Sequence, residues 1–411
     1  MQDIQAMDCA LCGQCITHCP TGALRERNDT VKVMDAIMDP EQIVIAQIAP
    51  AVRVAWGEGF GLTAEEATVG KMVSAARQIG FDYVFDTDFT ADLTIMEEGH
   101  ELLERLLQKK EAKMPMFTSC CPGWVRFMKS QFPAYVDHLS TAKSPQQMFG
   151  AVAKTYYADI LGVTPDKITC VSIMPCTAKK YECAVPQVND SGAERDVDVA
   201  LTTREFVRML CAAQVNIETL EEDTFDEPLG LGTGAGVIFG ATGGVMEAAL
   251  RSAYFFLKGE NAAADAFQAV RAEGFNANHG VQEAEFQIDD ITVRTAVVSG
   301  LGNTRALMKK IERGEVHYDF VEVMACPGGC VGGGGQPIHD GEERAFERGK
   351  RLYQLDADAK IRYSHDNPDI KRLYEEYFGE PNEHKAHMLL HTDHLESMER
   401  YGTGYRNYRE E

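Results

Sequence analysis

The sequence predicts an α/β fold of two lobes, preceded by a small cysteine-rich segment. The chain has 411 residues, which exceeds the roughly 250–300 residues at which one hydrophobic core usually divides. Stretches with the composition of buried strands alternate with helical stretches, a pattern typical of α/β proteins. Two cysteine loops directly follow predicted strands, and sites in α/β sheets usually lie at the carboxyl ends of the strands.

The predicted elements begin with a buried strand over Ile43–Ile48, which the Ala49-Pro50 pair ends. Thr63 and Glu66 form a capping-box pattern, so a helix is expected to start there. A short strand over 82–85 and a long helix over 91–110 follow. Farther along the chain we predict strands over 168–174, 197–201, 291–298 and 318–324 and helices over 203–210 and 305–311.

Composition excludes several classes of protein. A net charge of −23 argues against nucleic acid, whose backbone requires compensating Lys and Arg. No stretch reaches the ~18 apolar residues that a membrane span requires. No basic-then-apolar signal segment precedes Cys9. We therefore expect a cytoplasmic protein whose twelve cysteines are thiols or metal ligands rather than disulfides.

Four cysteines near the N-terminus have the spacing of an iron–sulfur motif. Cys9-x2-Cys12-x2-Cys15-x3-Cys19-Pro20 suits three thiolates around one [4Fe–4S] cluster, while the fourth normally serves a second cluster. A zinc site is the alternative, but zinc sites lack this tight run ending in Cys-Pro. No motif for a second cluster is present, so the sequence does not show which cluster Cys19 would bind. The fourth ligand is non-cysteinyl, or Cys19 folds back, or an upstream segment has been lost, which is the alternative we favour.

The adjacent Cys120 and Cys121 predict two different roles. Neighbouring side chains leave the backbone in different directions, so we expect one thiolate to hold metal and the other to stay free to move a proton. Cys121 would complete a four-thiolate set with Cys176, Cys326 and Cys330, all in loops rich in Pro or Gly. A phosphate cradle at the glycine run is the alternative, but no Lys-Ser/Thr follows it.

Other candidate residues have plain structural interpretations. Glu98, Glu101 and Arg105 share one helical face, and from spacing alone they would be a solvated surface. The three isolated cysteines are expected in the core. Four histidines share a second helical face, where a packing helix is favoured over a metal site; they are His384, His387, His391 and His394.

Three segments together resemble the signature loops of the iron-only ([FeFe]) hydrogenases. They are residues 118–124, 174–182 and 322–337, and the resemblance extends over roughly residues 31–380. It implies a two-lobed hydrogenase domain over 31–411 with the active cluster in the cleft between the lobes. Residues 1–30 would then be a partial ferredoxin-like [4Fe–4S] segment with Cys9, Cys12, Cys15 and Cys19.

The resemblance also implies the cofactor and its surroundings. In that family a [4Fe–4S] cubane is joined through one cysteine to a two-iron subsite carrying CO, cyanide and a bridging dithiolate amine. By position, Cys121, Cys176, Cys326 and Cys330 resemble the cubane ligands, with Cys330 as the bridge. Lys179 resembles the residue that hydrogen-bonds a cyanide, and the subsite lining would comprise Pro50, Gln146, Met174, Phe239 and Met324. From the residues alone, Met174 and Phe239 would be core.

Proton transfer is the second implication of the resemblance. By position Cys120 resembles the family's last proton carrier. An unligated thiol can hold a proton at neutral pH and pass it on. The family's relay would run Cys120–Glu98–Ser140–Glu101–Arg105 to the surface. The implied function is reversible reduction of protons to H2, with ferredoxin or another redox protein as partner.

Two other functions stay open. An H2-sensing relative would keep the fold without turnover, although sensors tend to lose the thiol found at Cys120. An iron–sulfur assembly protein would bind cubanes without the two-iron subsite, although Lys179, Met174 and Met324 together speak for a complete pocket. An infrared spectrum separates these classes. Only a two-iron site with CO and cyanide absorbs in the otherwise empty region of the CO and cyanide stretching vibrations.

Overall fold

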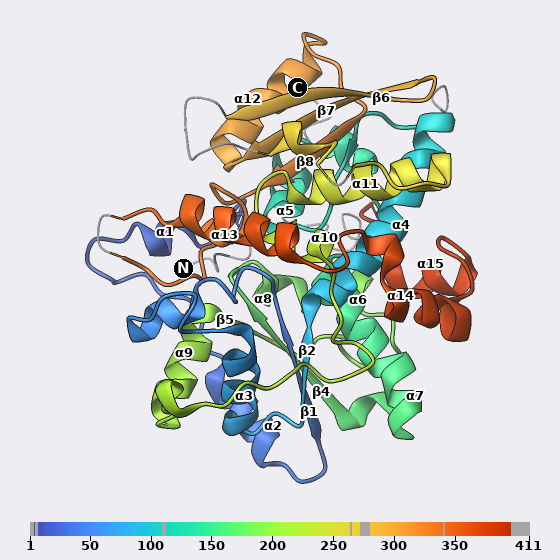
Figure 1. Cartoon of the computed structure of the whole chain (residues 1–411). Helices are drawn as coiled ribbons and strands as arrows, with labels where there is room; N and C mark the ends of the chain where they lie inside the picture. The colour runs from blue at the N-terminus through green and yellow to red at the C-terminus, as the bar shows by residue number, and fades with distance from the viewer. Residues whose placement is uncertain are drawn as a thin grey trace.

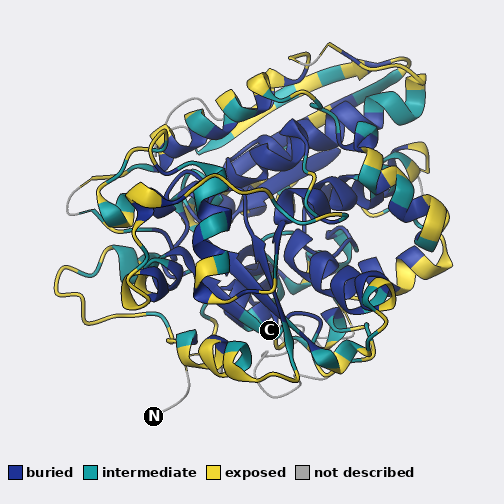
Figure 2. Ribbon diagram, turned by 60° about the horizontal axis from the view of Figure 1, so that its bottom comes forward, coloured by how far each residue is buried: buried dark blue, intermediate teal, exposed yellow. Residues whose placement is uncertain are grey.

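The computed structural model describes residues 4, 7–108, 112–263, 265–271, 280–339 and 342–395. It confirms the predicted two-lobed α/β architecture, with one four-stranded sheet in each lobe (Figure 1). Dark blue buried segments fill the interior of both lobes in Figure 2. No helix in the described part of the chain is long and apolar enough to cross a membrane.

The first lobe is built on a fully parallel sheet in the order β2-β1-β4-β5. Its β-branched strands are almost wholly buried, as expected of a parallel sheet covered on both faces. The strands are β1 Ile43–Ile48, β2 Tyr83–Asp86, β4 Ile168–Met174 and β5 Val199–Thr202. One face packs on α2 Thr30–Met38, α3 Val69–Ile79 and α9 Thr203–Ala212. The other packs mainly on α6 Pro145–Val152, α7 Ala158–Leu161, α14 Pro368–Leu373 and α15 His384–Leu390.

The second lobe has the order β3-β8-β7-β6, in which only β6 is antiparallel to its neighbour. Its strands are β3 Met116–Phe117, β6 Val281–Ile288, β7 Ile291–Ser299 and β8 Phe320–Met324. On one side lies α11 Gly244–Lys258, and on the other lie α5 Pro122–Gln131 and α12 Leu301–Glu312.

One long helix joins the two lobes. α4 Thr87–Leu107 begins directly after β2 and packs against α6 of the first lobe and α11 of the second. It is buried along most of its length. The remaining α-helices of the described residues are α1 Gln14–Thr17, α8 Lys179–Glu182, α10 Gly234–Val237 and α13 Ala345–Asp358.

Several predicted boundaries are wrong. The Thr63 and Glu66 box does form its hydrogen bonds, but only within a turn; α3 begins at Val69, where the Thr68 side chain accepts from Lys71 N. The helix predicted over 91–110 starts at Thr87, because Asp86 caps it, and its predicted end at Lys110 lies outside the described residues. The hairpin strand β6 and helix α11 were not predicted.

The three isolated cysteines differ in their burial. Cys170 and Cys183 are buried as predicted, but Cys211 is exposed, so that prediction is wrong. α9 buries Phe206, Met209 and Leu210, and the helical period turns the next residue towards solvent.

Candidate metal centre

The three predicted cysteine loops meet between the lobes. Cys120 and Cys121 follow β3, Cys176 follows β4, and Cys326 and Cys330 follow β8. β3 and β8 are parallel neighbours in the second sheet, whereas β4 belongs to the first. The site therefore exists only when both sheets are formed and packed together.

The four predicted ligand thiols lie close enough to influence one another electrostatically. Besides burial, which has the largest effect, the charges of Cys121 and Cys330 raise the pKa of Cys176. Burial and then the charge of Cys176 raise the pKa of Cys326. For Cys330, burial and the charge of Cys121 raise the pKa to about 12. Four thiolates in one desolvated space require a cationic partner, so this donor set fits an iron–sulfur cluster.

A glycine run brings backbone close to these thiols. An added Cβ at Gly333 would lie 2.2 Å from the Pro175 carbonyl oxygen, and one at Gly334 would lie 2.2 Å from the Cys12 carbonyl oxygen. Gly329 has φ 92°, a left-handed conformation that glycine adopts without strain. The third loop thus packs on both the second loop and the N-terminal segment, and no phosphate cradle is needed to explain its glycines.

Cys120 and Cys121 have different surroundings. The Cys121 sulfur accepts a hydrogen bond from Ala325 N at 3.4 Å, an interaction that stabilises a thiolate. At Cys120, burial and then the charge of Glu98 raise the pKa well above its usual value. Burial also raises the pKa of Cys121, so the hydrogen bond from Ala325 N, rather than the direction of the pKa, distinguishes the two sulfurs.

Lys179 lies beside Cys120. Its Nζ donates to the Cys120 carbonyl oxygen at 3.2 Å and pairs with Glu182 at 2.7 Å. Burial opposes its charge, but Glu182 and the neighbouring thiols raise the net pKa. A buried cation is therefore available next to the thiols.

Gln146 holds Lys179 and its partner Glu182 in place by hydrogen bonds. Its Nε2 donates to the Lys179 carbonyl oxygen and to Glu182, and its Oε1 accepts from Ser172. Gln146 is predicted to line the subsite, and these hydrogen bonds engage both its amide nitrogen and its amide oxygen. The other predicted lining residues are buried: Pro50, Met174, Phe239 and Met324. Glu182 and Ser172 were missed, although Glu182 ends the second quoted segment.

Three of the predicted relay residues, Glu98, Glu101 and Ser140, are buried, and Arg105 is half-buried. Ser140 Oγ donates to Glu101 at 2.8 Å, and Arg105 pairs with Glu101 at 2.5 Å. Glu98 is 1% exposed, and one of its carboxylate oxygens has no hydrogen-bond partner among the described residues. Burial, followed by the charge of Glu101, raises the pKa of Glu98 to about 8. The interpretation of these glutamates as a solvated face is wrong.

The N-terminal loop packs against the buried thiols. Thr177 Oγ1 donates to Leu11 O at 2.7 Å, and Gln14 Nε2 donates to Gly332 O at 2.8 Å. Burial and the charges of Cys121, Cys9 and Cys15 raise the pKa of Cys12. Cys12 therefore lies near both cysteine sets.

Cys19 has separate surroundings. Its sulfur lies 3.6 Å from Thr21 Oγ1. The Leu24 N–H and then the Thr21 hydroxyl lower the pKa of this thiol to about 7. A thiolate is thus stabilised here by a turn of its own.

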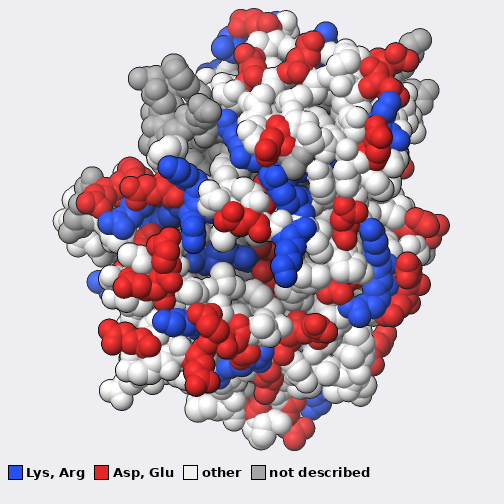
Figure 3. All heavy atoms as spheres, in the orientation of Figure 1, with Lys and Arg blue, Asp and Glu red and all other residues white. Residues whose placement is uncertain are grey.

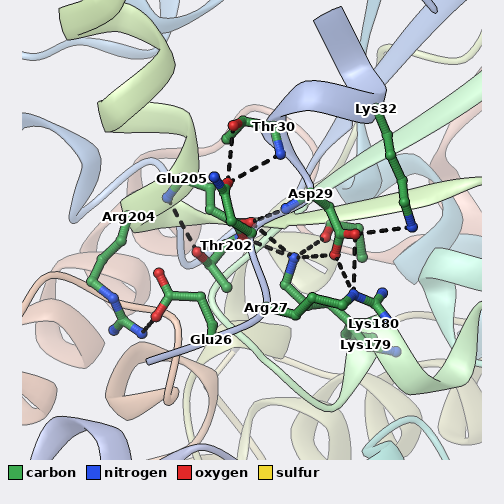
Figure 4. Close-up of polar contacts among 12 residues, drawn as sticks. Glu26, Arg27, Asp29, Thr30, Lys32, Lys179, Lys180, Thr202, Arg204 and Glu205 are labelled. Carbon is green, nitrogen blue, oxygen red and sulfur yellow. Dashed lines mark hydrogen bonds and ion pairs between the residues drawn. The ribbon is translucent and has the colours of Figure 1, made fainter. Parts of the chain in front are cut away.

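Two groups of ion pairs hold the linker, the segment that contains Glu26 and Asp29 (Figure 4). Lys180 Nζ pairs with Asp29 at 2.9 Å and Glu205 at 2.8 Å, and Asp29 N donates to Glu205 at 2.8 Å. Arg204 pairs with Glu26 at 2.7 Å and also donates to Gly334 O at 2.8 Å. We call these contacts the linker clamp. Spacing gave no signal for it, because its members are far apart in sequence.

The four C-terminal histidines do not share a helix. α15 ends at Leu390, so His391 and His394 lie beyond it, and the predicted common face is wrong. Among the described residues no group of three or more His, Cys, Asp or Glu side chains is arranged to hold a single metal ion.

Four cysteine thiols between two α/β lobes are a ligand set suited to a [4Fe–4S] cluster, which is the ligand set expected of an iron–sulfur protein. A family model for the iron only hydrogenase large subunit, C-terminal domain, matches residues 42–334, and one for the iron hydrogenase small subunit matches residues 342–396. The chain belongs to the iron-only hydrogenase family.

Known relatives and solved structures agree. The chain is 49% identical over 392 residues to the NADP-reducing hydrogenase subunit HndD of Solidesulfovibrio fructosivorans, covering 94% of this chain and 66% of that protein. It is 44% identical to iron hydrogenase 1 of Clostridium pasteurianum, covering 90% of this chain and 64% of that protein. An apo [FeFe]-hydrogenase HydA1 structure from Chlamydomonas reinhardtii has a TM-score of 0.77 at 39% identity, covering 89% of this chain and 98% of that one. This chain spans less than two thirds of the length of the first two relatives.

A relative from another functional class is also present. The cytosolic iron-sulfur assembly component 3 of Rattus norvegicus is 32% identical, covering 97% of this chain and 84% of that protein.

Proposed function

We propose that this chain catalyses the reversible reduction of protons to H2. The observation that carries the proposal is a four-thiol site with the Cys120 thiol and the buried Lys179 ammonium group beside it. Cys121, Cys176, Cys326 and Cys330 would hold an H-cluster, with Cys330 joining the cubane to the two-iron subsite. When bound, that group supplies the H2-forming chemistry, and the protein orients it, moves protons and excludes water.

Lys179 would donate a hydrogen bond to a cyanide of the subsite. Its pairing with Glu182 at 2.7 Å holds the ammonium group in one place, and Gln146 holds Glu182. Met174, Phe239 and Met324 are buried and would exclude water, together with Pro50.

Protons would travel between the surface and Cys120. Arg105 lies at the outer end, paired with Glu101; Ser140 bridges to Glu101; and Glu98 lies between these residues and Cys120. A group suited to proton transfer has a pKa near the working pH, and the pKa of Glu98 is about 8.

Electrons would enter at the N-terminal loop. Cys9, Cys12 and Cys15 would hold one [4Fe–4S] cluster beside the buried thiols. Across the middle of the face drawn in Figure 3, level with α1 and α13, several Lys and Arg side chains lie among Asp and Glu side chains. We infer a one-electron carrier such as ferredoxin as the partner. A division into residues 1–30 and 31–411 and a cytoplasmic location complete the proposal.

An infrared spectrum tests this function. The chain, expressed with the machinery that installs the two-iron subsite, is expected to show bands of bound CO and cyanide and to evolve H2 with reduced ferredoxin. A spectrum without these bands, from protein that contains its full complement of cubane iron, would overturn the proposal.

Iron–sulfur assembly is the second candidate function, favoured by the relative that shares 32% identity over 97% of the chain. Such a protein would carry cubanes without CO or cyanide. The same spectrum, together with transfer of iron–sulfur clusters to an apo-protein, decides between the two functions.

A further inference from the structure

The segment after α15 lies against the predicted proton relay. Ala142 and His391 form an antiparallel bridge, Lys143 N donates to Leu390 O at 2.8 Å, and Thr392 N donates to Thr141 O at 2.8 Å. We call residues 390–394 the strap. It pairs with the stretch that follows Ser140 by backbone hydrogen bonds, although some 250 residues separate the two along the chain.

His391 links the strap to both α4 and Thr141. Its Nε2 lies 2.9 Å from the Glu97 carboxylate and its Nδ1 lies 2.8 Å from Thr141 Oγ1. Glu97 also accepts hydrogen bonds from the Tyr374 hydroxyl and from Asn382 N. A carboxylate only accepts, so Nε2 carries the proton that it donates to Glu97. In the neutral ring, Nδ1 then accepts from the Thr141 hydroxyl.

His394 holds the same stretch at Ser140. Its Nε2 lies 3.0 Å from the Ser140 carbonyl oxygen, and a carbonyl oxygen only accepts, so this nitrogen donates. Burial, followed by the charge of Lys129, lowers the pKa of His394 to about 3. The ring is therefore neutral at ordinary pH.

The opposite side of this stretch contacts the relay itself. Ser140 Oγ donates to Glu101 at 2.8 Å, and Thr141 N donates to the same carboxylate at 3.0 Å. Arg105 donates to Leu139 O at 2.9 Å. Residues 139–141 are thus held between the strap and the side chains that would carry protons.

We propose that His391 and His394 are positioning residues for the proton relay, acting through residues 139–141. The inference rests on the proposed function, because it assigns these residues to the same proton path. Proton transfer requires hydrogen-bond distance between consecutive groups, and the strap fixes Ser140 and Thr141 at that distance from Glu101. Neither His391 nor His394 needs to carry a proton itself.

Two substitutions of His391 separate the two ring contacts. His391→Asn retains an acceptor near Nδ1 for Thr141, whereas His391→Gln retains a donor near Nε2 for Glu97 and loses the Thr141 contact. Glu97 keeps a partner in His391→Gln, and it also accepts from Tyr374 and Asn382 N, so we expect this variant to fold. His384→Asn is the matched control, since His384 is an exposed histidine at the start of α15.

We expect His391→Gln to lose turnover by up to about 10²-fold per two-iron site, because small misplacements of relay groups are costly. The turnover of His391→Asn should stay closer to the native value, and the turnover of His384→Asn should equal the native value. The solvent isotope effect on turnover should rise in His391→Gln, since proton transfer becomes slower than the other steps. Hydrogen exchange of the Thr141 amide should accelerate in the same variant.

The number of two-iron sites is counted by infrared absorption in each variant. Native turnover per site in His391→Gln, with native Thr141 exchange, would overturn the proposal. A loss of turnover that only follows loss of sites would also overturn it. If the native protein shows no CO or cyanide bands, the proposed function fails instead, and the Thr141 exchange then reports separately whether the strap orders this stretch.

Discussion

The two cysteine sites of this chain differ in how much of the fold they require. Cys9, Cys12 and Cys15 lie in one short loop around α1, and their spacing alone suits a cluster. Cys121, Cys176 and Cys326 follow strands of two different sheets, so they meet only after the lobes have packed. The N-terminal site is local and partly exposed, whereas the buried site depends on the whole tertiary structure.

This difference has a chemical consequence. In the buried site, desolvation raises the pKa of every predicted ligand thiol, so the thiolates depend strongly on a bound cation. In the exposed loop, the thiol of Cys19 is stabilised as a thiolate by its own turn. Substitutions should therefore have large effects in the buried site and smaller ones towards the N-terminus.

The largest effect is expected at the adjacent cysteines. Cys121→Ala should remove the buried cubane, because a three-thiol set leaves the cluster short of a ligand. Cys120→Ala should keep native iron content and cluster spectra but lose most H2 turnover. Iron analysis and electron paramagnetic resonance measure the first effect, and H2 evolution per cluster measures the second. The reverse pattern would exchange the two roles.

Glu98→Gln should have the next largest effect. We expect turnover to fall by about 10²–10⁴-fold, the usual contribution of a positioned acid or base. Glutamine keeps the shape of the side chain but cannot relay a proton. Glu101→Gln should behave similarly, and exposed Glu104 changed to Gln provides the control. Turnover within a few-fold of native in both relay variants would show that these glutamates carry no protons.

Glu98→Gln should also change how the stability of the protein depends on pH. The pKa of Glu98 is raised from 4.5 to about 8 by burial and then by Glu101. Between these two pH values the unfolded chain has released the proton while the folded protein retains it, so the free energy of unfolding falls as pH rises. The slope is about 1.4 kcal/mol per pH unit. Glu98→Gln should lose this slope in denaturant titrations, and an unchanged slope would contradict the assigned pKa.

The linker clamp should give an intermediate effect. Asp29→Asn removes one of the two carboxylates that pair with Lys180, and we expect a loss of about 1–3 kcal/mol in unfolding free energy. The clamp holds the linker against both α8 and α9, so the separation between the two cubanes should also become more variable. Pulsed dipolar spectroscopy on reduced protein measures that distribution. Glu315→Gln, in an exposed ion pair with Arg313, should change neither quantity.

The contrast between the sites also explains what the sequence could predict. Strand β4 was located residue for residue, because its β-branched run is buried on both faces. The motif cysteines were recognised from local spacing and resemblance. The linker clamp and the strap were not, because Asp29 with Lys180, and Thr141 with His391, are pairs that only tertiary packing brings together.

Helix ends were predicted less well for a physical reason. Thr63 and Glu66 form the hydrogen bonds of a capping box, yet the chain turns again before α3, because Thr68 provides a second cap at a position where the following residues can bury Met72 and Val73. The local signal was correct, and packing determined which of two caps starts the helix. The same holds for the histidines, which were predicted on one face by spacing, although α15 ends before two of them.

The smallest effect is expected at Cys19, where the local site is least complete. Its sulfur lies with Thr21 and the Leu24 N–H, while the charges that raise the pKa of Cys12 include those of Cys9 and Cys15. Cys19→Ser should therefore leave the iron count of reconstituted protein unchanged, whereas Cys15→Ser should lower it. The pKa of Cys19 is about 7, so roughly half of this thiol is ionised at pH 7, and it should react readily with iodoacetamide in the native protein. Loss of about four irons per chain in Cys19→Ser, or protection of Cys19 from alkylation by the reconstituted cluster, would show that Cys19 completes the N-terminal cluster.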